Sequence, residues 1–257
     1  MSLQPERIRR HMRRPKSDIP VAVVEKKASD FRRFRGCIYF SKFECLLGDA
    51  VVGIREYYEN RAIARETPIK DGQIHGRVYD WEEDGKLLSM EPWFHGKPHG
   101  IAKQYSSNRI LGTYKLLHGT GYDLWRSRGS DGTVYLSEIH SMKDGLPHGF
   151  TWWINRNKTI WNESHWHEGK LHGIERRWNN HGDLRGRLNR GYPKYWIKNR
   201  QVTRRRYLIE CRKDSTLPAY KASDDLPRRK FPSPLVHLVK DRRKVKIAKN
   251  CISCRAC

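Results

Sequence analysis

A glycine followed four or five residues later by an aromatic residue recurs through the middle of this chain. The intervals between these glycines are 23, 24, 21, 28, 24 and 18 residues, and the glycines are Gly53, Gly76, Gly100, Gly121, Gly149, Gly173 and Gly191. The aromatic residues that follow them are Tyr58, Trp81, Tyr105, Trp125, Trp153, Trp178 and Trp196. A regular period of this length indicates a repeat protein, in which each unit is one supersecondary motif that stacks on its neighbours.

Each unit contains two turn signals and two short runs with alternating polarity. One turn follows the aromatic residue, as at Asp131-Gly132, and the other precedes the lead glycine, as at Lys143-Asp144-Gly145. Glycine and asparagine tolerate the positive φ that tight hairpins require. Alternation such as that of Ile160–Trp166 is typical of strands. The sequence therefore predicts an all-β fold: an elongated antiparallel meander of about seven stacked β-hairpins.

The repeated aromatic residues have two interpretations. They form the shared core between stacked hairpins, or some of them line a groove for a ligand or peptide. Both can hold, because a single-layer sheet cannot bury every ring. If the rings are core, Trp153→Ala or Trp178→Ala should unfold the array, at about 3–5 kcal/mol each.

The dipeptide His-Gly also recurs, seven times in all. Zinc requires ligands that converge tetrahedrally, whereas these histidines are spread about one hairpin apart. We therefore expect turn residues that bond locally beside the lead glycine, and we expect neither a metal nor another cofactor.

The repeat units resemble MORN repeats. The resemblance is carried by residues Asp71–Trp81, Gly96–Tyr105, Asp144–Trp153 and Glu168–Trp178, and it covers roughly residues 50–210. These units are most similar to a variant with the pattern dGk.hG...yW..nG, which is found in bacterial antitoxin-type proteins and in large DNA viruses. Gly121, which follows a threonine, and Gly191, which ends a shortened unit, depart from that pattern. The resemblance implies a twisted β-meander that binds or tethers proteins or phospholipids, and it implies no catalysis.

Charge divides the chain into a body and two basic ends. The chain has 52 Lys and Arg against 28 Asp and Glu, a net charge of +24. Residues 1–36 contribute +7 and residues 200–257 contribute +12, which leaves +5 for residues 37–199. We therefore expect a basic N-terminal arm over 1–36, a cap over 37–52, a repeat domain over 53–210 and a basic, Pro-containing tail over 211–257.

The basic ends contain dense cationic runs that suit an anionic partner. The candidate anion-binding residues are Arg9, Arg10, Arg13, Arg14, Arg204, Arg205, Arg206, Arg242, Arg243 and Lys244. Contact with nucleic acid, with an anionic membrane surface or with a protein is open, as is a solvated tail with no specific partner. Binding to nucleic acid would be dominated by phosphate contacts and would weaken strongly with salt.

The chain ends in three cysteines, Cys251, Cys254 and Cys257. They are weak candidates for metal binding, because no fourth ligand is visible nearby. Lipidation next to a polybasic segment and free thiols are the alternatives.

The sequence contains no signature of catalysis, secretion or membrane insertion. It has no phosphate-binding loop, nucleophile elbow or HExxH motif, no secretory signal, and no apolar run long enough to span a bilayer. We therefore expect an intracellular, non-catalytic scaffold that binds a protein partner through its repeats. An antitoxin or immunity-type inhibitor and a structural component of a large-virus particle or nucleoprotein assembly are the alternatives.

Overall fold

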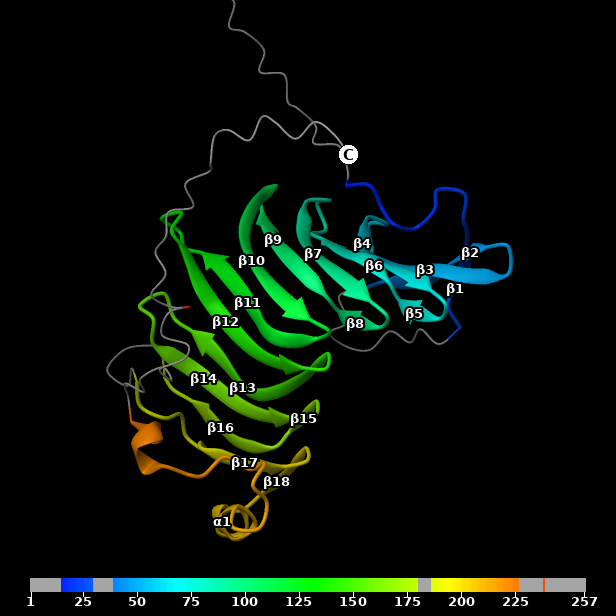
Figure 1. The fold of residues 1–257 in the computed structure, drawn as a ribbon. Helices are drawn as coiled ribbons and strands as arrows, with labels where there is room; N and C mark the ends of the chain where they lie inside the picture. The colour runs from blue at the N-terminus through cyan, green and yellow to red at the C-terminus, as the bar shows by residue number, and fades with distance from the viewer. Residues whose placement is uncertain (1–14, 30–38, 180–185, 227–237, 239–257) are drawn as a thin grey trace, which may run out of the picture.

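The computed structural model describes residues 15–29, 39–179, 186–226 and 238, which form one open antiparallel sheet of 18 strands with a short C-terminal helix (Figure 1). Strands β1 to β9 span Val24–Lys27, Ser41–Leu47, Ala50–Tyr57, Ile63–Lys70, Gln73–Ile74, Gly76–Trp81, Leu87–Phe94, Lys97–Pro98 and Gly100–Ser106. Strands β10 to β18 span Arg109–Leu117, Thr120–Arg128, Val134–Lys143, Leu146–Ile154, Ile160–His167, Lys170–Leu171, Gly173–Arg177, Lys194–Ile197 and Arg200–Val202. The all-β meander predicted from the repeat is confirmed.

The turns that precede the five inner lead glycines are two-residue hairpins with positive φ at both positions. At Asp144-Gly145, for example, φ is 54° and 86°. This geometry matches the twist of the flanking strands. Successive turns also bond to one another: the Gly145 amide donates to the Gly119 carbonyl at 3.0 Å, and the Gly169 amide donates to the Pro147 carbonyl at 2.9 Å. The turns therefore stack into a ladder along one edge of the sheet.

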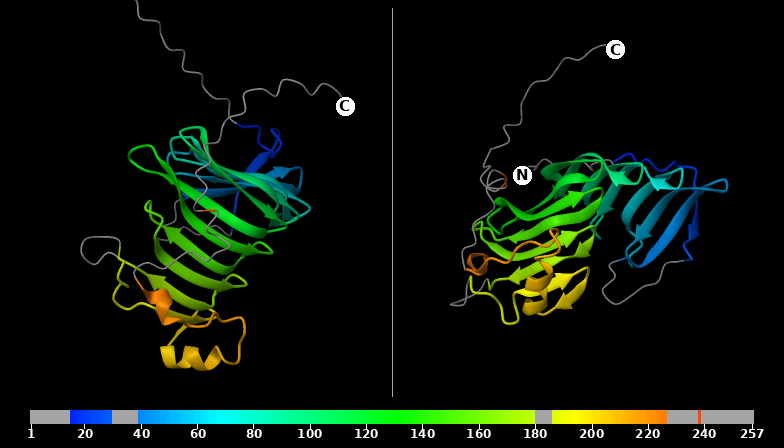
Figure 2. Two further views of the ribbon diagram at one scale, coloured as in Figure 1. Left: turned by 60° about the vertical axis from the view of Figure 1, so that its left-hand side comes forward. Right: turned by 60° about the horizontal axis from the view of Figure 1, so that its bottom comes forward.

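A β-bulge recurs once per hairpin. It lies on the strand that follows the outer turn, which is the turn after the aromatic residue of each unit. The residues skipped in the pairing register are Ala64, Leu88, Leu111, Ser137 and Trp161. A bulge bends its strand and increases the local twist. Its repetition at similar spacing accounts for the progressive twist and curvature of the sheet (Figure 2).

Five lead glycines share a conformation that side chains rarely adopt. Gly76, Gly100, Gly121, Gly149 and Gly173 all have φ between 88° and 150°. A Cβ on Gly173 would lie 2.6 Å from the Cβ of His165 on the neighbouring strand. Glycine is therefore required there by both conformation and space.

The two outermost lead glycines differ from the inner five. Gly53 has no positive φ, and a Cβ there would meet the side chain of Ile19. Gly191 has a φ of 85° but lies outside the strands, with no atom within 4 Å of its Cβ position. The ends of the array are therefore built differently from its middle, as repeat arrays require.

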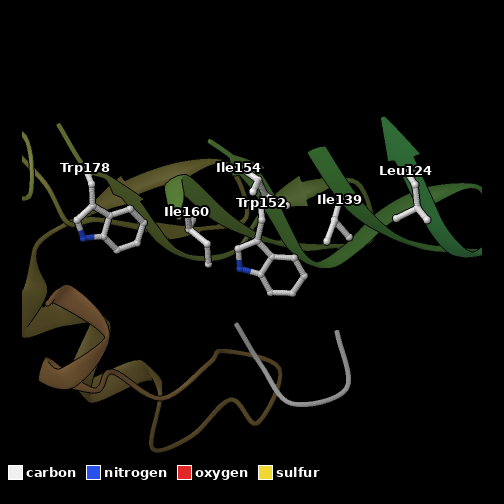
Figure 3. Close-up of a cluster of buried hydrophobic side chains, with 6 residues drawn as sticks. All are labelled: Leu124, Ile139, Trp152, Ile154, Ile160 and Trp178. Atoms are coloured by element: carbon white, nitrogen blue, oxygen red, sulfur yellow. The ribbon is translucent and has the colours of Figure 1, made fainter. Parts of the chain in front are cut away.

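One face of the C-terminal half of the sheet carries the main hydrophobic core (Figure 3). Leu124, Ile139 and Trp152 lie opposite one another on β11, β12 and β13. They pack with Ile154, Ile160 and Trp178, and Leu188 and Leu238 pack partly buried against the cluster. Segments that follow the last full hairpin therefore help to cover this face.

The C-terminal boundary that we expected at residue 211 divides a packed unit and is wrong. Helix α1 (Arg204–Glu210) places Tyr207, with no exposed surface, in a second cluster with Ile174, Tyr195 and Leu217. The 3-10 helix η2 (Ala222–Asp225) continues this unit. Residues up to 226 therefore belong to the fold, because their side chains complete a core that the last strands cannot close alone.

The expected N-terminal arm also contains residues that belong to the fold. Strand β1 pairs with β2 over four residues, and Ile19 is 3 % exposed beside Gly53. The Asp18 carboxylate accepts a hydrogen bond from the Arg77 amide at 2.7 Å. The stretch 15–29 is thus attached to the sheet, whereas residues 1–14 and 30–36 lie outside the described ranges.

The sheet is weakly joined between β10 and β11. Only two residue pairs connect these strands, whereas eight connect β11 and β12. Beyond these two pairs, the side chain of Gln104 takes the place of backbone hydrogen bonds to β11. Its amide nitrogen donates to the Arg126 carbonyl at 3.0 Å, and its oxygen accepts from the Arg126 amide at 2.8 Å. The two halves of the sheet meet at an angle there (Figure 2).

Across the described ranges, no helix is both long enough and apolar enough to cross a lipid bilayer.

Candidate functional site: a tryptophan face

The aromatic residues that follow the lead glycines divide between the two faces of the sheet. Trp81 and Trp178 come five residues after their glycines and are 2 % and 3 % exposed. Trp125 and Trp153 come four residues after theirs and are half-buried. Because strand side chains alternate, a difference of one residue places a ring on the opposite face. Tyr58, Tyr105 and Trp196 also come five residues after their glycines but are half-buried, so the five-residue spacing alone does not bury a ring.

Of the two interpretations, Trp153 fits the surface one. Its neighbour Trp152 belongs to the core: it is 3 % exposed, and its indole N–H donates to the Glu163 carboxylate at 2.8 Å. The core interpretation holds for Trp81 and Trp178.

Six of the nine tryptophans are half-buried, and they are Trp93, Trp125, Trp153, Trp161, Trp166 and Trp196. Sequence reasoning missed Trp93, Trp161 and Trp166 as candidates. Trp93 lies opposite Gly76, and Trp166 lies opposite Gly149, as Trp196 lies opposite Gly173. For Trp93 and Trp166 the signal was a tryptophan opposite a lead glycine on the neighbouring strand, which is visible only once the register is known. Trp161 lies at a bulge and has no such signal.

The centre of this arrangement is a row of residues in register across β11, β12 and β13. Trp125 pairs with Glu138, and Glu138 pairs with Trp153. The His140 ring stands edge-on to Trp153 at a centroid distance of 5.6 Å, and its Nε2 lies 2.9 Å from the Glu138 carboxylate. Trp161, at the bulge, lies 6.4 Å from Trp153. We call Trp125, Glu138, His140, Trp153 and Trp161 the tryptophan face.

A partly buried acidic cluster adjoins the tryptophan face at the bend of the sheet. The Glu91 carboxylate accepts hydrogen bonds of 2.8 Å from the Tyr114 hydroxyl and from the Trp93 indole N–H. Asp123 interacts with Tyr114 and with Trp125. Burial raises the pKa of both Glu91 and Asp123, because it disfavours the charged form of a carboxyl group.

Two further indole N–H groups on this side are bonded to polar groups of the sheet itself. Trp166 donates to the Ser164 hydroxyl at 3.1 Å, and Trp196 donates to the Glu175 carboxylate at 2.9 Å. A ring held by its N–H at the sheet buries one side and leaves the other toward solvent, which matches the half-buried state. The arrangement suits contact with flat apolar groups or with cations.

The histidines that precede four of the lead glycines lie beside the turns and not in them: His148 is in β13, and His75, His99 and His172 lie between strands. The Nδ1 of His99 accepts from the His118 amide at 3.1 Å, and the Nδ1 of His172 accepts from the Lys198 amide at 3.2 Å. Each such imidazole therefore ties one turn to the next. In the part of the chain that the structure describes, no group of three or more His, Cys, Asp or Glu side chains is arranged to hold a metal ion.

The remaining predicted site residues lie apart from the tryptophan face. Arg204, Arg205 and Arg206 are exposed on α1, and the guanidinium of Arg204 lies 4.7 Å from the ring centre of Tyr220. These arginines therefore belong to helix α1. The other basic candidates, Arg9, Arg10, Arg13, Arg14, Arg242, Arg243 and Lys244, lie outside the described residues, as do Cys251, Cys254 and Cys257.

The sequence matches no protein-family model and no curated protein.

Proposed function

We propose that this chain is a non-catalytic binding scaffold of MORN-like repeats whose tryptophan face contacts a protein partner. The basic residues, among them the exposed arginines of α1, attach the complex to an anionic surface or molecule. The observation that supports this function best is the contrast between two neighbouring residues: Trp152 is buried in the core, and Trp153 is half-buried on the other face.

A sheet needs only one apolar face to fold, and the core face here has it. That face is covered by Leu188, Leu238 and the C-terminal unit. Large half-buried rings on the other face therefore exceed what folding requires. Tryptophan is enriched at the energetic centres of protein interfaces, which favours a binding role for this face.

The test is capture of partners from native lysate with the tagged full-length chain. The wild type is compared with a Trp125→Ala/Trp153→Ala double variant, and a Tyr122→Ala variant is the control because Tyr122 is an exposed ring outside the tryptophan face. Captured material is washed with nuclease and with high salt, and retained proteins are identified by mass spectrometry.

We expect the wild type and Tyr122→Ala to retain the same protein through both washes, and the double variant to lose it. Retention that is equal in the double variant, or that disappears entirely with nuclease and salt, would contradict a binding role for the tryptophan face.

A further inference from the structure

Resting on this proposed function, we propose that the tryptophan face binds a lysine or arginine side chain of an extended peptide segment. The cation would lie over Glu138, between the rings of Trp125 and Trp153. This assigns a chemical class to the partner: a protein segment with a basic residue in extended conformation.

The register places a carboxylate between two aromatic walls. Trp125, Glu138 and Trp153 stand opposite one another on three consecutive strands. Adjacent strands lie about 4.8 Å apart, so the two tryptophans flank Glu138 at a separation of about 10 Å. A cation over Glu138 would lie within reach of both rings, and cation–π attraction adds to the ion pair when the cation is desolvated.

Among the residues that the structure describes, no lysine or arginine is bonded to the acidic groups around this position, although the charge of Arg65 acts on Glu91. Within the described chain, the hydrogen-bond partners of Glu91 are the Tyr114 hydroxyl and the Trp93 indole, and the ion-pair partner of Glu138 is His140. Asp123 Oδ1 is buried, with no hydrogen-bond partner among the described residues. That atom is out of reach of a ligand, whereas the Glu138 side chain is 35 % exposed and can pair with an incoming ammonium or guanidinium group.

The attraction of a basic peptide to the tryptophan face acts only at short range, because the rest of the molecule is positively charged. The whole chain has a net charge of +24, so long-range electrostatics repel a basic peptide. Binding of such a peptide therefore requires the specific geometry of the tryptophan face. This separates the proposal from general charge attraction, which would favour an acidic peptide.

The experiment measures the fluorescence anisotropy of a labelled peptide of four alternating Lys-Thr pairs with purified full-length protein. A Glu-Thr peptide of the same length is the charge control. Glu138→Gln removes the central carboxylate, and Glu82→Gln makes the same change of charge at an exposed turn. We expect saturable binding of the Lys-Thr peptide, at least tenfold weaker binding in Glu138→Gln and in Trp153→Ala, and unchanged binding in Glu82→Gln.

Three results would overturn the assignment: no saturable binding to the wild type, equal loss in Glu138→Gln and Glu82→Gln, or tighter binding of the Glu-Thr peptide. Cellohexaose is titrated in parallel, and tryptophan-dependent binding of that neutral sugar in place of the peptide would also overturn it. Thermal unfolding of each variant shows whether the fold is retained. If capture from lysate still depends on Trp125 and Trp153 while the peptide fails to bind, the cationic assignment is wrong and the binding role stands.

Discussion

At the scale of single residues, two adjacent tryptophans have opposite roles. The Trp152 ring stacks on Phe150 at 5.4 Å and bonds to buried Glu163, whereas Trp153 contacts His140 and Trp161 on the other face. Chemical identity therefore does not decide the role of these residues. Position along the strand does, because the side-chain period is two.

Replacement of these tryptophans by alanine should have unequal effects on stability. We expect Trp152→Ala to lower the free energy of unfolding by about 3–5 kcal/mol, because it leaves a cavity and removes one of the hydrogen-bond donors to buried Glu163. Trp153→Ala should cost less than half as much, since its ring is only half-buried. Urea unfolding of both variants measures this, and equal destabilisation would contradict the assignment of faces.

The lead glycines provide a second comparison between single residues. Gly173 and Gly132 both have positive φ, but a Cβ at Gly173 would lie 2.6 Å from His165, while nothing lies within 4 Å at Gly132. Gly132→Ala should therefore cost only the conformational penalty of about 1–2 kcal/mol. Gly173→Ala should cost clearly more in the same urea experiment. Equal stability of the two variants would show that the close approach of His165 is not the reason for glycine at position 173.

At the scale of elements, the hairpin turns are joined by imidazoles that must stay neutral. The Nδ1 atoms of His148 and His172 accept backbone N–H groups, which a protonated ring cannot do. Burial lowers the pKa of both. Burial also lowers the pKa of His165 to about 4, and its Nδ1 lies 2.5 Å from the His172 carbonyl oxygen.

The fold should therefore lose stability as the pH falls from 7 toward 4. A histidine whose pKa is lower in the folded state binds its proton more readily in the unfolded chain, so acid favours unfolding over the window between the two pKa values. For His165 this amounts to about 1–2 kcal/mol between pH 7 and pH 5.

Urea unfolding at several pH values measures this dependence. In His165→Asn the loss between pH 7 and pH 5 should be smaller than in the wild type. In His95→Asn, at an exposed turn, it should be unchanged. An identical pH dependence in wild type and His165→Asn would show that this imidazole does not contribute.

The elements themselves were predictable from the sequence, and the assignment of faces was not. Glycine, asparagine and aspartate at the turns mark the hairpins directly, because few other residues tolerate positive φ. The bulge in each hairpin, as at Trp161, shifts the alternation by one residue. No particular residue type marks a bulge in the sequence. Trp153 comes four residues after its glycine and Trp178 comes five, and this difference of one residue places the two rings on opposite faces.

The composition of the terminal segments also did not predict which of their residues belong to the fold. Ile19 and Leu217 lie in stretches dominated by basic and polar residues, yet both are buried, at 3 % and 5 % exposed. Isolated apolar residues in a charged segment give no periodic signal. They pack because the hairpin at each end of the array has no next hairpin to cover its apolar side chains. For this reason a fragment trimmed to residues 37–210 would lose parts of the fold at both ends.

At the scale of the whole molecule, a buried ionic network fastens the C-terminal unit to the sheet. The Arg176 guanidinium donates to Glu163 at 2.9 Å and to Asp225 at 2.7 Å, and Arg176 is 2 % exposed. The Tyr220 hydroxyl donates to the same Asp225 carboxylate at 2.7 Å. The network thus joins β14, β16 and η2, and it holds the last residues of the fold over the core.

Asp225→Asn should release this unit, because it leaves the Arg176 charge partly unpaired in a buried site. Breaking a buried ion pair costs about 3–5 kcal/mol, and backbone amides of residues 204–226 should exchange faster with deuterium. Asp144→Asn breaks the exposed pair with Lys97 and should leave both stability and exchange nearly unchanged. Slow exchange of the C-terminal unit in Asp225→Asn would rule out this fastening role.

The central claim is that one face of the sheet is core and the other presents tryptophans for binding. Hydroxyl-radical footprinting with mass spectrometry tests it directly, because it reports the oxidation rate of each tryptophan in the intact protein. We predict slow oxidation of Trp81, Trp152 and Trp178, and markedly faster oxidation of Trp125 and Trp153. Oxidation of Trp152 as fast as that of Trp153 would contradict the two-faced sheet on which the proposed function rests.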